Sequence, residues 1–232
     1  MKRNYYLDSF RGFTIISMVL FHLAYNINYY RPISWYDGTT FNRIWQLSIA
    51  LSFFLISGIS SSLLPSDKNI KRGIKTSIIG FAITISTYIF AKDQLIVWGV
   101  LNGLGLSMII AGLIQKSWKI PPYFAIIFLL VFIGTYNIPR FSLAGIGIFD
   151  YLYENNIFIL GFPSSGFTST DYFPIIPWIF AYLSGLGTGN YLKEKNLSKG
   201  SDNTLAKIGR FSMPIYLAHQ IILYPLVSFF LS

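Results

Sequence analysis

The chain has 232 residues, of which 53% are hydrophobic and only 12% are charged. A soluble domain carries about 25% charged residues, so this composition excludes an ordinary soluble protein and predicts that most of the chain lies in lipid. The net charge of +9 comes from basic residues spread between apolar runs, which indicates membrane topology rather than nucleic-acid binding. The absence of cysteine excludes disulfides and thiolate chemistry.

Long, continuous apolar runs predict membrane helices, each of which needs about 20 residues to cross the bilayer. Seven runs have this character: 9–30, 44–64, 74–91, 95–115, 121–136, 173–192 and 205–231. The fold class is therefore predicted to be all-α, a polytopic membrane helix bundle of about seven transmembrane helices forming a single domain over residues 1–232. A weaker apolar patch at 146–162 contains Asp150 and Glu154 and is interpreted as a surface or re-entrant segment. If it crossed the membrane, the count would become eight.

Basic residues between the predicted spans alternate between the two sides. One side holds Lys2, Arg3, Lys68, Lys71, Arg72, Lys75, Lys116, Lys119, Lys193, Lys195, Lys199, Lys207 and Arg210, and the other holds Arg31, Arg43, Lys92 and Arg140. The positive-inside rule then places the N-terminus in the cytoplasm and the C-terminus outside, in a multi-pass protein of the cell membrane. The segment 137–172 would face outward, as either a ligand-binding loop or an ordinary interfacial loop.

The first predicted span carries four polar groups that lipid would disfavour, namely Asp8, Arg11, His22 and Asn26. At about 100° per residue, His22 lies within about 20° of the helix face of Arg11, and Met18 falls on that face too. Ionisable groups inside a bilayer are costly and usually mark an interior path or site. The alternative is a packing stripe with a hydrogen-bonded histidine, in which Asp8 and Arg11 form an anchoring ion pair.

Polar and small residues also mark the fourth span. Gly99 and Gly103 form a G-x-x-x-G pattern, with Gly105 just beyond, and such small residues are typical of close helix packing. Asn102 lies between them and is expected to point inward.

The start of the sixth span contains a carboxylate at Asp171, three residues before Pro174. Asp171 is predicted to cap this helix, or alternatively to bind or deprotonate a polar acceptor from the outer side.

The last span contains the second of only two histidines in the chain. Ser212, Tyr216, His219 and Gln220 are spaced so that they share one helical face. His219 lies about 13 Å along the helix from Arg210, at a depth near the bilayer centre. Neutral histidine is the usual general base near pH 7, whereas two histidines without cysteines or a carboxylate cluster make a poor metal site, so none is predicted.

Taken together, these motifs resemble the heparan-α-glucosaminide N-acetyltransferase catalytic family in a compact bacterial form. The resemblance rests on LDSFRG and MVLFH at 7–22, FFLISG at 53–58, GVLNGLGLS at 99–107, DYFPIIPW at 171–178 and IGRFSMPIYLAHQ at 208–220, in this order. Two positions depart from the family pattern: Asn26 and Asn102 stand where relatives often carry Asp and His.

The resemblance implies a membrane acetyltransferase that moves an acetyl group from cytoplasmic acetyl-CoA, its co-substrate, to an extracytoplasmic sugar amine or hydroxyl. It implies a catalytic membrane histidine, which falls on His22. Asn102 and Asp171 are added to the catalytic residues from their positions in the sequence, Asp171 to hold the sugar. The residues expected to contact acetyl-CoA are Arg11, Arg72, Arg210, Met18, Tyr216, His219 and Gln220, with the arginines on its phosphates. Tyr216, Gln220 or Asn102 would donate to the oxyanion. The expected partners are acetyl-CoA, a glycan or amino sugar and the lipid bilayer, with no nucleic acid, and a homodimer stays open.

Two other functions stay open, and the first of them also needs a polar stripe inside the membrane. One is a transporter or flippase of a polar glycan precursor, which would neither hydrolyse acetyl-CoA nor become labelled by it. The other is a non-catalytic membrane protein of a cell-envelope assembly, which would not bind CoA.

Overall fold

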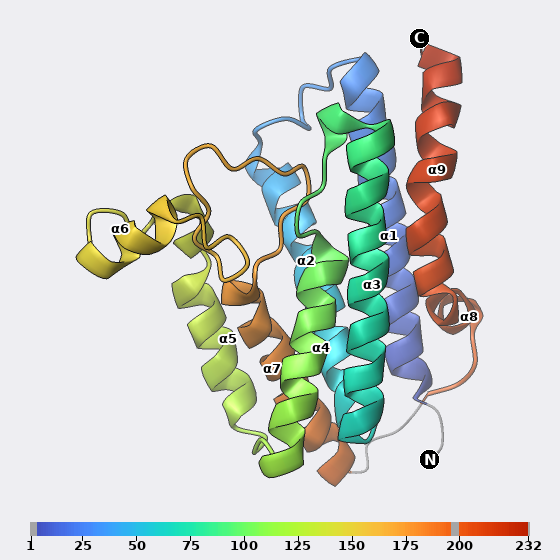
Figure 1. Ribbon diagram of the computed structural model, residues 1–232. Coiled ribbons are helices and arrows are strands. Elements are labelled where there is room, and N and C mark those ends of the chain that lie inside the picture. The colour runs from blue at the N-terminus through green and yellow to red at the C-terminus, as the bar shows by residue number, and fades with distance from the viewer. Residues whose placement is uncertain (1–3, 196–199, 232) are drawn as a thin grey trace. The chain divides into compact units, whose positions relative to one another are not determined.

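A computed structural model describes residues 4–195 and 200–231 and is helical in every long element (Figure 1). The basic residues Lys2, Arg3 and Lys199, which were used to predict the topology, lie outside the described residues. The helices are α1 (Tyr5–Tyr30), α2 (Thr40–Ser62), α3 (Ser66–Phe90), α4 (Val100–Ser117), α5 (Phe124–Thr135), α6 (Gly147–Glu154), α7 (Ile175–Glu194), α8 (Thr204–Arg210) and α9 (Ser212–Leu231), with short 3₁₀ turns at Lys92–Gln94 and Ile138–Arg140.

Five of these helices are long and apolar enough to cross a membrane: α1, α2, α3, α4 and α9. The segment of α7 was also predicted to span, but this helix is not among the five, and glycine, Ser184 and Asn190 interrupt its apolar sequence. The fifth predicted span forms α5, whose 12 residues extend only about 18 Å. The all-helical membrane architecture is therefore confirmed, whereas the count of seven and the cytoplasmic N-terminus stay predictions.

The chain divides into two units, of which the first comprises Met1–Ile56 and Leu197–Ser232. It contains α1, most of α2, α8 and α9. Within this unit α1 contacts both α8 and α9, and α1 and α9 run in the same direction (Figure 1). The start of α1 and the end of α9 therefore lie at opposite ends of the unit, which requires an odd number of crossings if both helices span the membrane.

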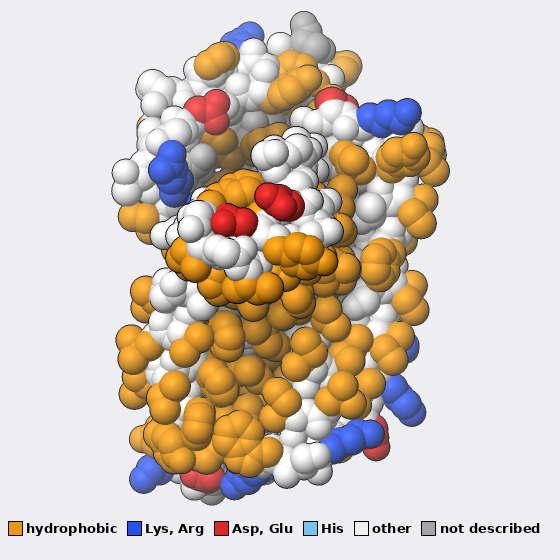
Figure 2. Space-filling model, turned by 60° about the vertical axis from the view of Figure 1, so that its left-hand side comes forward, with side chains coloured by type: hydrophobic (Ala, Val, Ile, Leu, Met, Phe, Trp, Pro, Cys, Tyr) orange, Lys and Arg blue, Asp and Glu red, His pale blue; other side chains and the backbone are white. Residues whose placement is uncertain are grey.

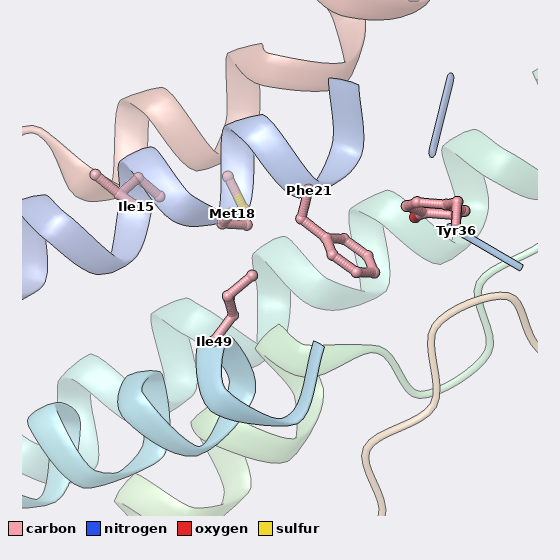
Figure 3. Close-up of a cluster of buried hydrophobic side chains, with 5 residues drawn as sticks. All are labelled: Ile15, Met18, Phe21, Tyr36 and Ile49. Carbon is pink, nitrogen blue, oxygen red and sulfur yellow. The ribbon is translucent and has the colours of Figure 1, made fainter. Parts of the chain in front are cut away.

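A hydrophobic cluster holds the first unit together (Figure 3). Ile15, Met18 and Phe21 extend from one face of α1 and meet Ile49 of α2, with Tyr36 from the connecting segment beside them. A hydrogen bond from the Trp45 indole N–H to Ser17 Oγ, at 2.9 Å, also ties α2 to α1.

The second unit, Ser57–Asn196, contains α3 to α7 and the end of α2. Its α3 and α4 pack closely because glycine faces glycine: a Cβ atom on Gly73 would lie 2.6 Å from the carbonyl oxygen of Gly105. The predicted packing role thus holds for Gly105. Gly99 instead lies against Asp171 at the start of α4.

The patch at 146–162 forms only the eight-residue helix α6, followed by turns. Eight residues extend about 12 Å, which is too short to cross a bilayer, as the interpretation of a surface or re-entrant segment requires. The segment with α6 extends outward from the second unit (Figure 1). Figure 2 shows acidic side chains on the part that faces the viewer, above a broad hydrophobic face. Exposed side chains of α5, including Ile126, Leu130 and Ile133, belong to the apolar surface that such a protein presents to lipid.

Candidate active site

The two histidines of the chain lie beside each other in the first unit. His22 on α1 and His219 on α9 have ring centroids 4.7 Å apart, with the ring planes inclined by 53°. The contact between the two rings places residues 22 and 219 at the same depth along the parallel helices α1 and α9. The sequence predicted two intramembrane histidines on polar stripes, and the structure brings these stripes together.

Two amide side chains connect α1 to α9 next to His22. Gln220 Nε2 lies 3.1 Å from His22 Nδ1, and Asn26 Nδ2 donates to Gln220 Oε1 over 2.9 Å. Asn26 is 2% exposed, so its amide needs a partner within the protein. We call Asn26, Gln220 and His22 the amide relay.

His219 is oriented by its own helix. Its Nδ1 contacts the backbone carbonyl oxygen of Tyr216, which can only accept a hydrogen bond. The proton of neutral His219 therefore lies on Nδ1, and Nε2 carries a lone pair. Nε2 is buried and has no hydrogen-bond partner within the described part of the chain. A buried nitrogen whose lone pair accepts no hydrogen bond is suited to take a proton from a substrate.

The two histidines are thus a pair of imidazoles in van der Waals contact, held by different partners. General acid–base or nucleophilic catalysis needs such groups within reach of one reacting centre. Tyr216 also faces this pair, with its ring centroid 5.5 Å from that of His219. Of the predicted site residues, the structure therefore groups His22, Tyr216, His219 and Gln220.

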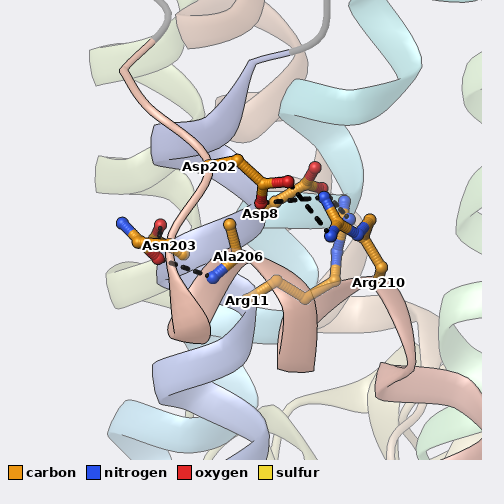
Figure 4. Close-up of polar contacts among 7 residues, drawn as sticks. Asp8, Arg11, Asp202, Asn203, Ala206 and Arg210 are labelled. Atoms are coloured by element: carbon orange, nitrogen blue, oxygen red, sulfur yellow. Dashed lines mark hydrogen bonds and ion pairs between the residues drawn. The ribbon is translucent and has the colours of Figure 1, made fainter.

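Two ion pairs lie near the start of α1 (Figure 4). Arg11 contacts Asp8 at 3.0 Å, as predicted, and Arg210 contacts both carboxylate oxygens of Asp202, at 3.0 and 3.4 Å. Figure 4 shows these two carboxylates and two guanidinium groups gathered where α1 meets α8. Asp8 is buried, whereas Asp202 is exposed. A phosphate ligand would have to compete with these carboxylates for the two arginines.

Close contact between α1 and α8 positions this cluster. A Cβ atom on Gly12 would collide with the carbonyl oxygen of Leu205, and one on Gly209 would collide with that of Asp8. Asn203 caps α8 by accepting from the Ala206 N–H, and it also accepts from Ser9 Oγ at 3.0 Å (Figure 4). The glycines thus allow the backbone approach that places Arg210 beside the start of α1.

Met18 lies in the hydrophobic cluster. Its side chain is 3% exposed and packs with Ile15, Phe21 and Ile49 (Figure 3). Met18 precedes His22 by four residues, so the two side chains share a side of α1, as the helical wheel predicted. The predicted contact of Met18 with acetyl-CoA stays a prediction.

Asp171 caps a different helix from the predicted one. Its Oδ2 accepts from the Val100 N–H over 2.9 Å, at the start of α4, whereas α7 begins at Ile175 after Pro174 without a side-chain cap. Burial raises the pKa of Asp171 to about 6, opposed in part by this hydrogen bond. The sequence could not reveal a cap that acts over 71 residues.

Asn102 and Arg72, both in the second unit, differ in their surroundings. Asn102 is 1% exposed and presses against Gly80 of α3, and neither of its amide atoms has a partner among the residues described. Arg72 lies half-buried on α3. In the described ranges it has no carboxylate within ion-pair distance, unlike Arg11 and Arg210.

Sequence reasoning did not assign Asn26 to the site. It noted Asn26 on the polar stripe of the first span, four residues after His22. That spacing places both side chains on one face of a helix. The missing information was the partner, because Gln220 lies 194 residues away in sequence.

Parallel helices that hold a histidine pair and an amide relay between them define a multi-pass helical membrane protein with a polar site between α1 and α9. The catalytic-domain model of heparan-alpha-glucosaminide N-acetyltransferase matches residues 3–221, nearly the whole chain. The chain therefore belongs to this family, as the resemblance predicted, and it is a transmembrane acetyltransferase by family. No curated protein and no solved structure matches it.

Proposed function

We propose that this protein transfers the acetyl group of cytoplasmic acetyl-CoA to an amine or hydroxyl of an extracytoplasmic sugar. The observation that carries this proposal is the contact between His22 and His219 inside a chain of this family. An acyl thioester attached to a nucleotide is too polar to cross a bilayer, so transfer has to occur within the helix bundle. The distribution of basic residues supports a cytoplasmic N-terminus in the cell membrane.

The phosphates of acetyl-CoA require cations on the cytoplasmic side. Arg72 supports this role best, because no carboxylate neutralises it among the residues described. In the first unit, Arg11 and Arg210 would each bind a phosphate by exchanging a carboxylate for it. Partly exposed ion pairs contribute only about 0.2–1 kcal/mol each, so a multiply charged ligand can displace them.

The chemistry needs a group that accepts a proton and a group that stabilises negative charge. In direct transfer, the acceptor nitrogen or oxygen loses a proton to an imidazole and bonds to the acetyl carbon. The carbon–sulfur bond then breaks, and the CoA thiolate receives the proton. In the two-step route, an imidazole nitrogen bonds to the acetyl carbon as the carbon–sulfur bond breaks, and CoA leaves with the proton of that imidazole. The acceptor then bonds to the acetyl carbon as the carbon–nitrogen bond to the imidazole breaks, and the acceptor's proton returns to that imidazole. His22 and His219 can serve both routes, and Tyr216 or Gln220 can donate to the oxyanion.

Asn102 and Asp171 of the second unit are proposed for the roles that their own surroundings within that unit suit. Asn102 offers a buried amide without a partner among the described residues, which suits an oxyanion donor. Asp171 would contact the sugar from the outer loop. Its hydrogen bond to Val100 leaves its second carboxylate oxygen for such a contact.

The test uses the full chain purified and reconstituted in lipid nanodiscs, with acetyl-CoA and glucosamine. We expect acetylated product and free CoA in equal amounts, and a loss of about 10²–10⁴-fold in rate for His22→Ala. Leu20→Ala, a change at a half-exposed position on the same helix, is the matched control and should keep the wild-type rate. Full activity of His22→Ala would remove His22 from the mechanism. A wild-type protein that releases no CoA would contradict the proposed function and favour a transporter.

A further inference from the structure

The amide relay runs between the two ends of the chain and ends on one nitrogen of His22. Asn26 Nδ2 donates to Gln220 Oε1, which turns the Nε2 amide group of Gln220 toward His22 Nδ1, 3.1 Å away. A primary amide nitrogen can only donate. In this order of hydrogen bonds Nδ1 of His22 is an acceptor, so the proton of the neutral imidazole lies on Nε2.

The neighbouring histidine has the opposite arrangement. The Tyr216 carbonyl accepts from His219 Nδ1, so His219 carries its lone pair on Nε2. The two rings lie 4.7 Å apart between centroids. One imidazole therefore offers an N–H donor at Nε2 and the other offers a proton acceptor at Nε2.

We propose that Asn26 and Gln220 are positioning residues that fix the tautomer of His22, so that the histidine pair divides its work. This inference rests on the proposed acetyl transfer. His219 takes the proton from the acceptor amine as nitrogen bonds to the acetyl carbon. His22 donates a hydrogen bond from Nε2 to the thioester carbonyl oxygen as that oxygen becomes negative. The carbon–sulfur bond then breaks, and the proton on His219 passes to the CoA thiolate.

The relay makes an unusual prediction for Asn26, which does not contact His22 through any hydrogen bond described. A carboxylate can only accept hydrogen bonds. Asn26→Asp should therefore turn the Gln220 amide around, so that Oε1 faces His22 and accepts from a protonated Nδ1. Gln220→Glu should produce the same tautomer directly. Both substitutions keep the size of the side chain.

The experiment reads the tautomer without relying on activity. The full chain, labelled with ¹⁵N-histidine and purified through a tag without histidine, contains only two imidazoles. Solid-state ¹⁵N spectra of the protein in lipid separate protonated from unprotonated ring nitrogens, and His219→Gln assigns the remaining signals to His22. The same preparations are assayed for acetyl transfer with glucosamine and acetyl-CoA.

We expect wild-type His22 to be protonated on Nε2 and unprotonated on Nδ1. We expect Asn26→Asp and Gln220→Glu to reverse this, with transfer at saturating substrate reduced about 10–100-fold and the KM for acetyl-CoA changed less than threefold. Gln46→Glu adds the same charge at an exposed position of α2 in the first unit, outside the relay, and should leave the His22 tautomer unchanged.

A wild-type His22 protonated on Nδ1, or an Asn26→Asp protein with an unchanged His22 spectrum, would overturn the inference. If Asn26→Asp does not fold, the wild-type spectrum and that of Gln220→Glu decide the question. Failure of the proposed function looks different: the wild-type protein would give the expected tautomers and yet transfer no acetyl group.

Discussion

The helix pairs α1–α9 and α3–α4 bury polar groups in different ways. Between α1 and α9, Asn26 donates a hydrogen bond to Gln220, and Gln220 contacts His22. Among the residues described there, His219 Nε2 is the one buried side-chain atom without a hydrogen-bond partner. Between α3 and α4, glycines bring the backbones together, and Asn102 is enclosed with both amide atoms unpartnered among the described residues. The first pair is built from polar side chains, and the second pair is built from small ones.

This difference indicates what each pair can do. A connected set of hydrogen bonds holds side chains in fixed orientations, which acid–base chemistry requires. Close glycine packing instead brings the two helix backbones together and leaves the Asn102 amide without a partner among the described residues. We therefore place the chemistry at α1–α9 and a supporting role at α3–α4, and three further substitutions test this division.

The largest effect is expected where the backbones touch in the second unit. In Gly105→Ala the new Cβ atom would approach Ser77 Oγ and the Ser77 backbone nitrogen too closely, so α3 and α4 must separate. We expect a loss of stability of about 1–3 kcal/mol or more, measured by the detergent or thermal denaturation midpoint. Gly134→Ala on α5 is the control, because nothing lies within 4 Å of its added Cβ. Equal stability of the two variants would show that α3 and α4 do not need the close approach.

A smaller effect is expected at Asn102, and it should fall on activity rather than stability. Asn102→Ala removes no hydrogen bond from the described protein, so the stability should change by less than about 1 kcal/mol. As an oxyanion donor, Asn102 would contribute about 10–100-fold to the transfer rate. The assay with acetyl-CoA and glucosamine measures this. A fully active Asn102→Ala protein would limit the chemistry to the α1–α9 pair.

The smallest effect concerns pH and Asp171. A carboxyl group with a raised pKa in the folded state favours folding most at low pH, and this contribution is lost as the pH rises from about 4 through about 6. Asp171→Asn keeps an acceptor for the Val100 N–H but does not titrate. We expect the melting temperature of the wild type, relative to that of Asp171→Asn, to fall over this interval. Parallel curves would show that the Asp171 pKa is not raised.

The same substitution separates two functions of Asp171. If the carboxylate only caps α4, Asp171→Asn should transfer acetyl groups at the wild-type rate above pH 6. If it binds the sugar as an anion, the KM for glucosamine should rise while the KM for acetyl-CoA stays unchanged.

Local pattern predicted the helices and much of the α1–α9 site. Apolar runs of about 20 residues located α1 to α4 and α9, and the polar stripes found His22, His219 and Gln220 because their spacing follows the helix period. Asp8 and Arg11 are three residues apart and form the predicted ion pair.

Features that depend on distant partners could not be predicted in this way. Asp171 caps α4 rather than its own helix, and Met18 packs with Ile49 of α2 in the hydrophobic cluster. The close contact between Gly12 of α1 and the Leu205 backbone of α8 likewise joins residues that are almost 200 positions apart in the sequence. A single sequence predicts on which side of a helix a residue lies, but it does not predict which distant residue packs against it.

The parallel course of α1 and α9 has a consequence for biosynthesis. His22 on α1 is synthesised 198 residues before Gln220 on α9. A nascent chain that contains α1 but not yet α9 therefore has no histidine pair and no amide relay, and the pair can form only after the helices between them have been synthesised.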